Sequence, residues 1–137
     1  MTGLAAVCSG LHNTIGVYKM PSNIEIKQSR EWIQHFGLEH LSKKILSEMN
    51  YAETRMILSL RAMIHTPKLL ILDEPCQGLN ERQQDQIFDF IDGLIQKTST
   101  QLLYVTHDVD DRLSSITHQI KLSPDSDGIS RAQFTTP

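Results

Sequence analysis

Two short apolar runs, separated by an amphipathic segment, constrain the fold most strongly. Residues 69–72 and 102–105 are each apolar without alternation, which is typical of strands buried on both faces of a parallel sheet. Residues 81–96 between them show helical periodicity, with an apolar face made by Ile87, Phe88, Ile91, Leu94 and Ile95. Strand, helix and strand in this order form a right-handed crossover unit. The sequence therefore predicts an α/β fold with parallel core strands and flanking helices.

Two further helices are predicted upstream of the first strand. Apolar residues recur at helical spacing from Ile26 to Phe36, and Gly37 follows where a C-terminal cap is expected. The range 51–65 has the same periodicity. Asn50 precedes it as an N-cap, and Glu53 stands three residues later in a capping-box arrangement. Pro67 disfavours helical geometry at the residue before it and so ends this helix.

The two ends of the chain are less regular. Residues 4–18 contain two glycines around a short apolar pattern, and their secondary structure is ambiguous from the sequence. Ranges 116–122 and 129–134 flank the turn-rich stretch 124–128 and predict a pair of strands at a sheet edge. Asp110 and Asp111 are expected to begin another helix, because negative charge favours a helix N-terminus. A length of 137 residues fits a single domain.

Composition excludes several classes of function. A net charge of −3 without a dense Lys/Arg run argues against nucleic-acid binding. No apolar run approaches the roughly 20 residues that a membrane-spanning helix needs. Cys8 and Cys76 fit no metal-ligand spacing with each other or with the histidines, and they are interpreted as reduced thiols. A soluble cytoplasmic protein is expected, and any association with a membrane would depend on a partner.

Asp73 and Glu74 follow the first apolar run directly. Ligands of open α/β sheets bind at the C-terminal ends of the strands. One carboxylate there can hold Mg²⁺ while its neighbour orients a water molecule for attack on a phosphate. The alternative is that Asp-Glu-Pro simply caps the strand and begins a turn. His107 ends the second strand, where an imidazole is often only a structural hydrogen-bonding group.

The order of these motifs resembles the C-terminal half of an ABC transporter ATPase domain, from about Gln28 onward. By this resemblance the chain is a single partial domain of the P-loop NTPase fold, with Walker B at 69–74, the D-loop at 78–80 and the H-loop at 107. The resemblance implies that Asp73 serves the Mg²⁺ site, that Glu74 is the general base and that His107 reaches the γ-phosphate. It implies ATP and Mg²⁺ as cofactors.

The ABC signature is expected at 49–53, before the helix that begins at Tyr51. The family usually reads Leu-Ser-Gly-Gly-Gln there, whereas this chain reads Met-Asn-Tyr-Ala-Glu. Asn50 can still cap the helix. Ala52 stands where the family has a glycine, and Glu53 adds negative charge near the expected phosphate. In the D-loop, Asn80 replaces the usual Asp. The resemblance nevertheless assigns Asn50, Ala52, Glu53 and Asn80 to nucleotide binding.

The chain contains no Gly-x-x-x-x-Gly-Lys-Ser/Thr, the Walker A loop whose backbone N–H groups and Lys cradle the β- and γ-phosphates. No Gln-loop or upstream aromatic adenine platform is identified either. Without these groups the phosphate charge lacks its main donors. The isolated chain is therefore expected to bind and hydrolyse ATP poorly. A truncated reading frame, a split gene or an excised fragment would each account for such a sequence.

A finer resemblance is to molybdate-type ABC ATP-binding proteins, through residues 10–18, 74–79 and 116–118. The family resemblance implies ATP hydrolysis coupled to transport. Its implied partners are a second ABC ATPase subunit or the missing N-terminal half, and a membrane permease. The implied location is the cytoplasm, at the inner face of the membrane through a partner.

One alternative belongs to a different class of function, a non-catalytic interaction module that pairs with a complete ATPase subunit. Missing sheet strands would leave exposed edges and an apolar face, which drive association, so an oligomer is expected. A truncation product without function is the third reading.

Overall fold

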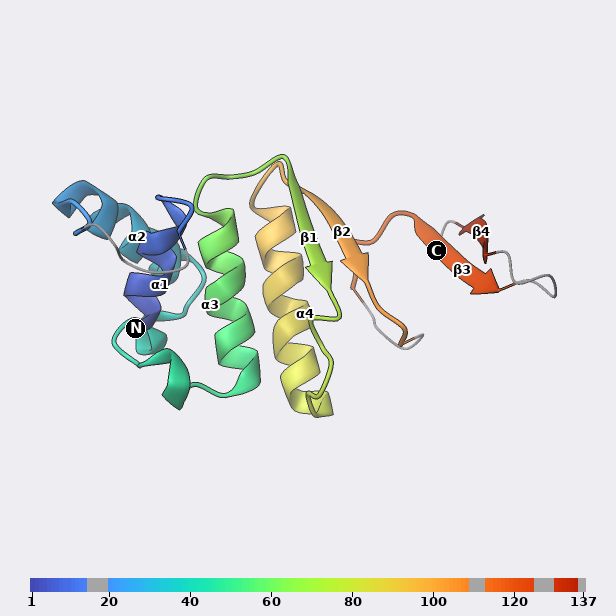
Figure 1. The fold of residues 1–137 in the computed structure, drawn as a ribbon, viewed down its shortest axis with the longest axis horizontal. Helices are drawn as coiled ribbons and strands as arrows, with labels where there is room; N and C mark the ends of the chain where they lie inside the picture. Colours follow the sequence, from blue (N-terminus) through green and yellow to red (C-terminus); the bar gives the residue numbers. More distant parts are fainter. Residues whose placement is uncertain (15–19, 109–112, 125–129, 136–137) are drawn as a thin grey trace.

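The computed structural model describes residues 1–14, 20–108, 113–124 and 130–135. Helices come first, and the strands follow around one long helix (Figure 1). The elements in chain order are α1 (Gly3–Gly10), α2 (Asn23–His35), the 3₁₀ helices η1 (Glu39–Leu41) and η2 (Leu46–Glu48), α3 (Tyr51–Met63), β1 (Leu69–Asp73), α4 (Glu81–Gln96), β2 (Gln101–Val105), β3 (Gln119–Pro124) and β4 (Ser130–Thr135).

The crossover unit predicted from the two apolar runs is confirmed. β1 and β2 pair in parallel, and α4 connects them. The register places Leu70 opposite Leu102 and Asp73 opposite Val105. Both strands therefore end at the same edge of the sheet, which brings the residues that follow them together.

The prediction that both faces of these strands are buried is wrong for this chain. Leu70 is buried and Leu72 is partly buried, whereas Leu69 and Ile71 are exposed. In β2, Leu103 and Val105 are likewise exposed. Successive side chains of a strand point to opposite faces. The physical reason is that the helices that the structure describes cover only one face of the sheet, although the residues on both faces are apolar.

α3 begins as the sequence predicts. Asn50 is its N-cap: the side chain accepts a hydrogen bond from the Glu53 backbone N–H, and the Glu53 carboxylate accepts one from the Asn50 backbone N–H. α3 ends at Met63, two residues before the predicted end. α2 also has a capping box, formed by Ser22 and Glu25, and Gly37 adopts φ +69° just after its C-cap.

α1 resolves the ambiguity at the N-terminus. Thr2 caps it, its residues 6–10 are buried, and it packs against α2 and α3. α1 lies very near α3 at Gly10, because a Cβ added there would lie 2.3 Å from the backbone oxygen of Arg61. The core joins all four helices with β1, and its largest fully buried apolar side chains are Ile33, Leu41, Ile57, Leu60, Met63, Ile87, Ile91 and Leu94.

The predicted C-terminal strand pair is also found. β3 and β4 are antiparallel, and within the described ranges they form a sheet of their own rather than an added edge of β1–β2. Figure 1 draws this pair at the far end of the molecule from α1 and α2. The helix predicted at Asp110 and Asp111 lies outside the described residues.

Asp92 of α4 holds the segment that leads to β3. Its carboxylate accepts hydrogen bonds from the backbone N–H groups of Ser114 and Ser115, at 2.9 and 3.0 Å, and from the Ser114 hydroxyl at 2.7 Å. Partial burial acts to raise the pKa of Asp92. The hydrogen bonds from both serines outweigh it and hold that pKa below its ordinary value.

Among the helices that the structure describes, none has the length and apolar character required to cross a bilayer.

Candidate functional site

Glu74 and His107 meet at the ends of the two parallel strands. Nδ1 of His107 lies 2.7 Å from Oε1 of Glu74. Glu74 follows β1, and its backbone N–H donates to the Val105 carbonyl at the end of β2. The two side chains are 33 positions apart in sequence, and the parallel register of the strands is what brings them together.

The Glu74 backbone has an uncommon conformation, with φ +47°. For a residue other than glycine this left-handed region costs about 1–2 kcal/mol, and such residues cluster at functional sites. The chain leaves the strand here and turns, because the Gln77 backbone N–H donates to the Glu74 carbonyl. The turn follows directly on the carboxylate that meets His107.

Asp73 is the last residue of β1. Asp73 is exposed. Because successive side chains of a strand point to opposite faces, Asp73 lies on the same face of the sheet as Ile71 and Leu69. Oxygen ligands are what Mg²⁺ prefers, and Mg²⁺ usually takes one or two carboxylates together with substrate phosphates. No cluster of three or more acidic, His or Cys side chains that could hold a metal occurs in the described ranges. The exposed carboxylate of Asp73 is of the chemical kind that can provide one such ligand.

Asn80 has a structural position at the start of α4. Its side chain accepts from the Gln83 backbone N–H at 3.0 Å, and the Gln83 side chain accepts from the Asn80 backbone N–H at 3.2 Å. The preceding Gly78 has φ +78°, a region that glycine enters without strain. The loop between β1 and α4 thus ends in a closed capping box.

Three other predicted residues, Asn50, Ala52 and Glu53, lie together at the start of α3. Ala52 is fully buried in the core. The Glu53 carboxylate binds Nζ of Lys44 at 2.6 Å in addition to its capping role. Asn50 and Glu53 border a groove of about 450 Å³ that Asp73, Glu74 and His107 do not line. The structure therefore divides the predicted residues among three places: the ends of β1 and β2, the start of α4 and the start of α3.

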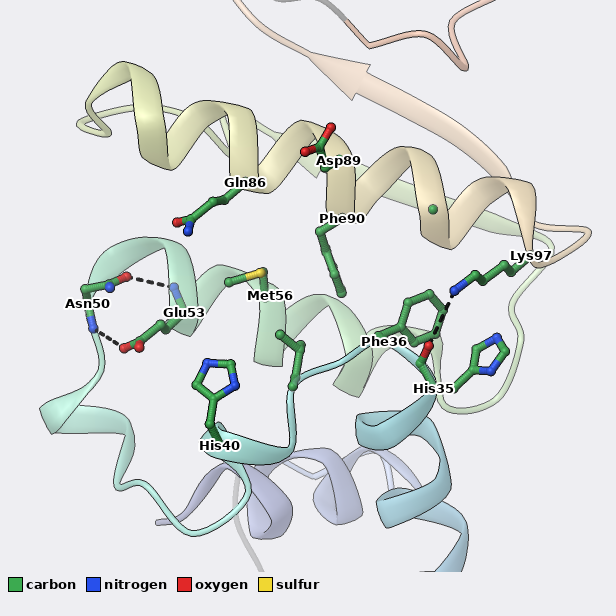
Figure 2. A pocket seen from close by; sticks show the side chains of 12 residues that line it. His35, Phe36, His40, Asn50, Glu53, Met56, Gln86, Asp89, Phe90 and Lys97 are labelled. Atoms are coloured by element: carbon green, nitrogen blue, oxygen red, sulfur yellow. Dashed lines mark hydrogen bonds between the residues drawn. The ribbon is translucent and has the colours of Figure 1, made fainter.

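The groove lies between α3, α4 and the end of α2 (Figure 2). Phe36 and Phe90 meet edge to face at its wall, with ring centroids 5.7 Å apart, and Nζ of Lys97 lies 5.1 Å from the Phe36 ring centroid. Phe36 ends the apolar helical pattern that begins at Ile26, whereas Phe90 and Lys97 belong to no predicted site. The helical period of α4 does place Phe90 and Lys97 two turns apart on one side, and this was the available signal.

The ion pair of Glu53 predicts how stability depends on pH. Partial burial acts to raise the pKa of Glu53, but hydrogen bonds from Lys44 and the Asn50 backbone lower it below its ordinary value of 4.5. A lowered folded-state pKa contributes stability above the unfolded value, and this contribution is lost as the pH falls through the folded value. We therefore expect Glu53→Gln to destabilise the protein at neutral pH, with a difference that shrinks below pH 4.5.

Urea unfolding from pH 7 to pH 3 measures this difference. Glu31→Gln is the matched control, because Glu31 is exposed and its pairing with Lys27, at 3.8 Å, is a surface contact that contributes about 0–1 kcal/mol. A Glu53→Gln effect that stays constant over the whole range would contradict this account of the ion pair.

Comparisons with known proteins find similarity to ATP-binding proteins of transporters. No protein-family model matches the chain. The chain is 34% identical over 120 residues to the ABC transporter ATP-binding protein ModF of Escherichia coli strain K12. The aligned residues cover 87% of this chain and 24% of ModF. It is 32% identical over 109 residues to the taurine import ATP-binding protein TauB of Escherichia coli O6:H1, covering 80% of this chain and 42% of TauB.

Solved structures share the fold. MJ1267, an ATP-binding cassette of an ABC transporter, superposes with a TM-score of 0.75 and 23% identity, over 86% of this chain and 50% of that one. An inward-facing putative metal-chelate type ABC transporter gives 0.77 and 20%, over 99% and 52%. The chain thus has a partial ABC ATPase fold of the P-loop NTPase class. It spans from 24% to 52% of the length of each protein named here.

Proposed function

We propose that this chain, whose relatives are ATP-binding proteins of ABC transporters, forms the C-terminal half of an ATP-hydrolysing domain that drives transport. One observation carries the proposal. Glu74 and His107 are 2.7 Å apart at the ends of two parallel strands, and Asp73 is the last residue of the first of these strands. A carboxylate and an imidazole at this edge of an α/β sheet are suited to act on a phosphate and its attacking water.

Each residue would have a distinct task. Asp73 would hold Mg²⁺, which neutralises charge on the phosphates when it is bound. Glu74 would accept a proton from the attacking water, and His107 would contact the γ-phosphate while Glu74 orients its ring. Asn50, Ala52 and Glu53 would belong to the signature and Asn80 to the D-loop, the two segments that would border the nucleotide. The glycine-rich phosphate loop would come from another half-domain, and we call the two together the assembled domain.

The family resemblance also supports the proposed partners and location. A second ATPase subunit and a membrane permease would complete a transporter, and the chain would lie in the cytoplasm at the inner face of the membrane. The molybdate-type subfamily is the narrower proposal, and it rests on the stretches 10–18, 74–79 and 116–118. Assay of the assembled domain for phosphate release from Mg-ATP tests the function, and a lack of release would reject it.

A second candidate function is a non-catalytic module that pairs with a complete ATPase subunit. The exposed apolar face of β1 and β2 favours it, because such a surface promotes association whether or not ATP is hydrolysed. A complex with a complete ATPase subunit that hydrolyses ATP equally well with Glu74→Gln would favour this candidate over catalysis.

Binding of Mg-ATP is expected to differ between the chain alone and the assembled domain. We expect the chain alone to give no heat of binding at micromolar nucleotide, because the backbone donors that cradle the phosphates are absent from it. The assembled domain should bind, and Asp73→Asn should remove the dependence on Mg²⁺. Isothermal calorimetry measures both, with the MJ1267 cassette as the positive control. Micromolar binding by the chain alone would contradict the need for a second half.

A further inference from the structure

A side chain of β2, Tyr104, contacts the turn that carries Glu74. The Tyr104 hydroxyl donates a hydrogen bond to Sγ of Cys76, 3.5 Å away. Cys76 lies two residues after Glu74, within the turn that the Gln77 backbone N–H closes by donating to the Glu74 carbonyl. Cys76 is buried, with 6% of its surface exposed. The contact therefore joins a buried part of the turn to β2.

The register of the sheet explains how Tyr104 reaches the turn. Tyr104 is opposite Leu72, near the end of β1 from which the turn departs. It is partly buried while its neighbours Leu103 and Val105 are exposed, so its ring lies on the face that the helices cover. A buried tyrosine hydroxyl usually has a hydrogen-bond partner, and the Cys76 sulfur, a weak acceptor, provides one here.

Two neighbouring residues of β2 thus hold two points of the turn. The Val105 carbonyl accepts from the Glu74 backbone N–H at 2.9 Å, and the Tyr104 hydroxyl holds Cys76. One attachment alone would let the turn rotate about it, whereas two attachments set its orientation. Orientation matters because Glu74 has φ +47°, a strained conformation that persists only where the surrounding structure imposes it.

His107 depends on the same strand. It follows the end of β2 by two residues, and its Nδ1 lies 2.7 Å from Oε1 of Glu74. β2 therefore supports both members of the pair, one through the turn and the other through the chain itself. A shift of the turn relative to β2 would change their separation directly, and functional groups have to be held to within about 0.5 Å.

We infer that Tyr104 is a positioning residue. Through Cys76, its hydroxyl holds the turn in the orientation that presents the Glu74 carboxylate to His107. The inference rests on the proposed function only for its effect on catalysis. The alternative is that Tyr104 and Cys76 merely fill space in the core. Packing requires the ring and the volume of the cysteine side chain, whereas positioning requires the hydroxyl and an acceptor.

¹⁵N NMR of the His107 ring in the chain alone tests the positioning. The hydrogen bond that a ring nitrogen makes determines which nitrogen carries the proton, and a carboxylate can only accept. With the ring neutral, contact with Glu74 favours the tautomer protonated at Nδ1. Tyr104→Phe and Cys76→Ala should each lower the ratio of this tautomer to the other by about 3–10-fold, the equivalent of one net hydrogen bond. Tyr51→Phe makes the same chemical change at an exposed tyrosine and should leave the ratio unchanged.

Two more variants separate positioning from packing. Cys76→Ser keeps an acceptor for the Tyr104 hydroxyl and should retain the ratio of the unchanged chain. Tyr104→Phe combined with Cys76→Ala should lower the ratio no further than either change alone, because both remove the same hydrogen bond. An unchanged ratio in Tyr104→Phe would overturn the inference. Equal losses in Cys76→Ser and Cys76→Ala would also overturn it, as would additive losses in the double variant.

Kinetics of the assembled domain test the effect on catalysis. Tyr104→Phe should lower kcat by about 10-fold and leave KM for Mg-ATP unchanged, since a misplacement of about 1 Å can cost about 10²-fold in rate. A tautomer effect in the chain alone, without hydrolysis by the unchanged assembled domain, would keep the positioning and reject the proposed function. Hydrolysis at equal rates by the unchanged domain and Tyr104→Phe would keep the proposed function and reject the positioning.

Discussion

Replacing Glu74 with glutamine is expected to lower ATP hydrolysis by the assembled domain about 10²–10⁴-fold, which is the usual contribution of a positioned general base. Glutamine keeps the shape of the side chain and can still hydrogen-bond to His107, but it cannot accept a proton from water. Binding of Mg-ATP should persist, since Asp73, the proposed metal ligand, is unchanged. Phosphate release under saturating nucleotide measures the rate, and calorimetry measures the binding.

The matched control is Glu81→Gln, which makes the same chemical change at an exposed carboxylate in the first turn of α4. It should hydrolyse ATP like the unchanged protein. His107→Ala gives a separate readout, because loss of the imidazole removes the group that Glu74 contacts and leaves the carboxylate in place. A Glu74→Gln domain that retains hydrolysis within a few-fold would show that another group activates the water.

Substitution of Gly10 by alanine is expected to destabilise the protein by about 1–3 kcal/mol, the usual cost of overpacking. The added Cβ would lie 2.3 Å from the backbone oxygen of Arg61 and 3.0 Å from a methyl group of Ile64. The obstacle is mainly backbone, so α1 and α3 have to move apart, and this disturbs the contact between them.

Gly93→Ala is the control of opposite sign. Gly93 lies within α4, and an added Cβ meets no atom within 4 Å. Alanine there should stabilise the protein by about 0.5–1 kcal/mol, because glycine loses more conformational freedom on folding. Urea unfolding of both variants measures the two effects. A Gly10→Ala protein as stable as the unchanged one would mean that α1 and α3 can separate without cost.

The sequence predicts the local structure well where side chains determine it locally. Asn50 and Glu53 indicated a capping box, and that box is present at the start of α3. The proximity of Glu74 and His107 followed from two apolar runs that each end in a polar residue, since parallel strands end at one edge. α1 was harder, because residues 6–10 are all buried and such a helix shows no alternation between an apolar and a polar face.

The exposure of one face of β1 and β2 could not be anticipated from the apolar runs themselves. A strand such as β1 has the same residues whether its second face is covered by this chain or by another body, so the sequence indicates the burial that the strand needs and not its source. The φ of +47° at Glu74 was also beyond prediction. Glutamate has no preference for that conformation, and the surrounding turn imposes it.

The capping box of α3 has a consequence for how tightly this end of the helix can hold a nucleotide. The Glu53 carboxylate already accepts a hydrogen bond from the Asn50 backbone N–H and forms an ion pair with Lys44. The N-terminus of α3 therefore already carries one anionic group. A phosphate that binds at this helix end would have to compete with the Glu53 carboxylate. Only the difference between the interaction energies of the two anions would contribute to nucleotide affinity. This helix end would therefore contribute little to nucleotide affinity. Most of the affinity would come from the opposite half of the assembled domain.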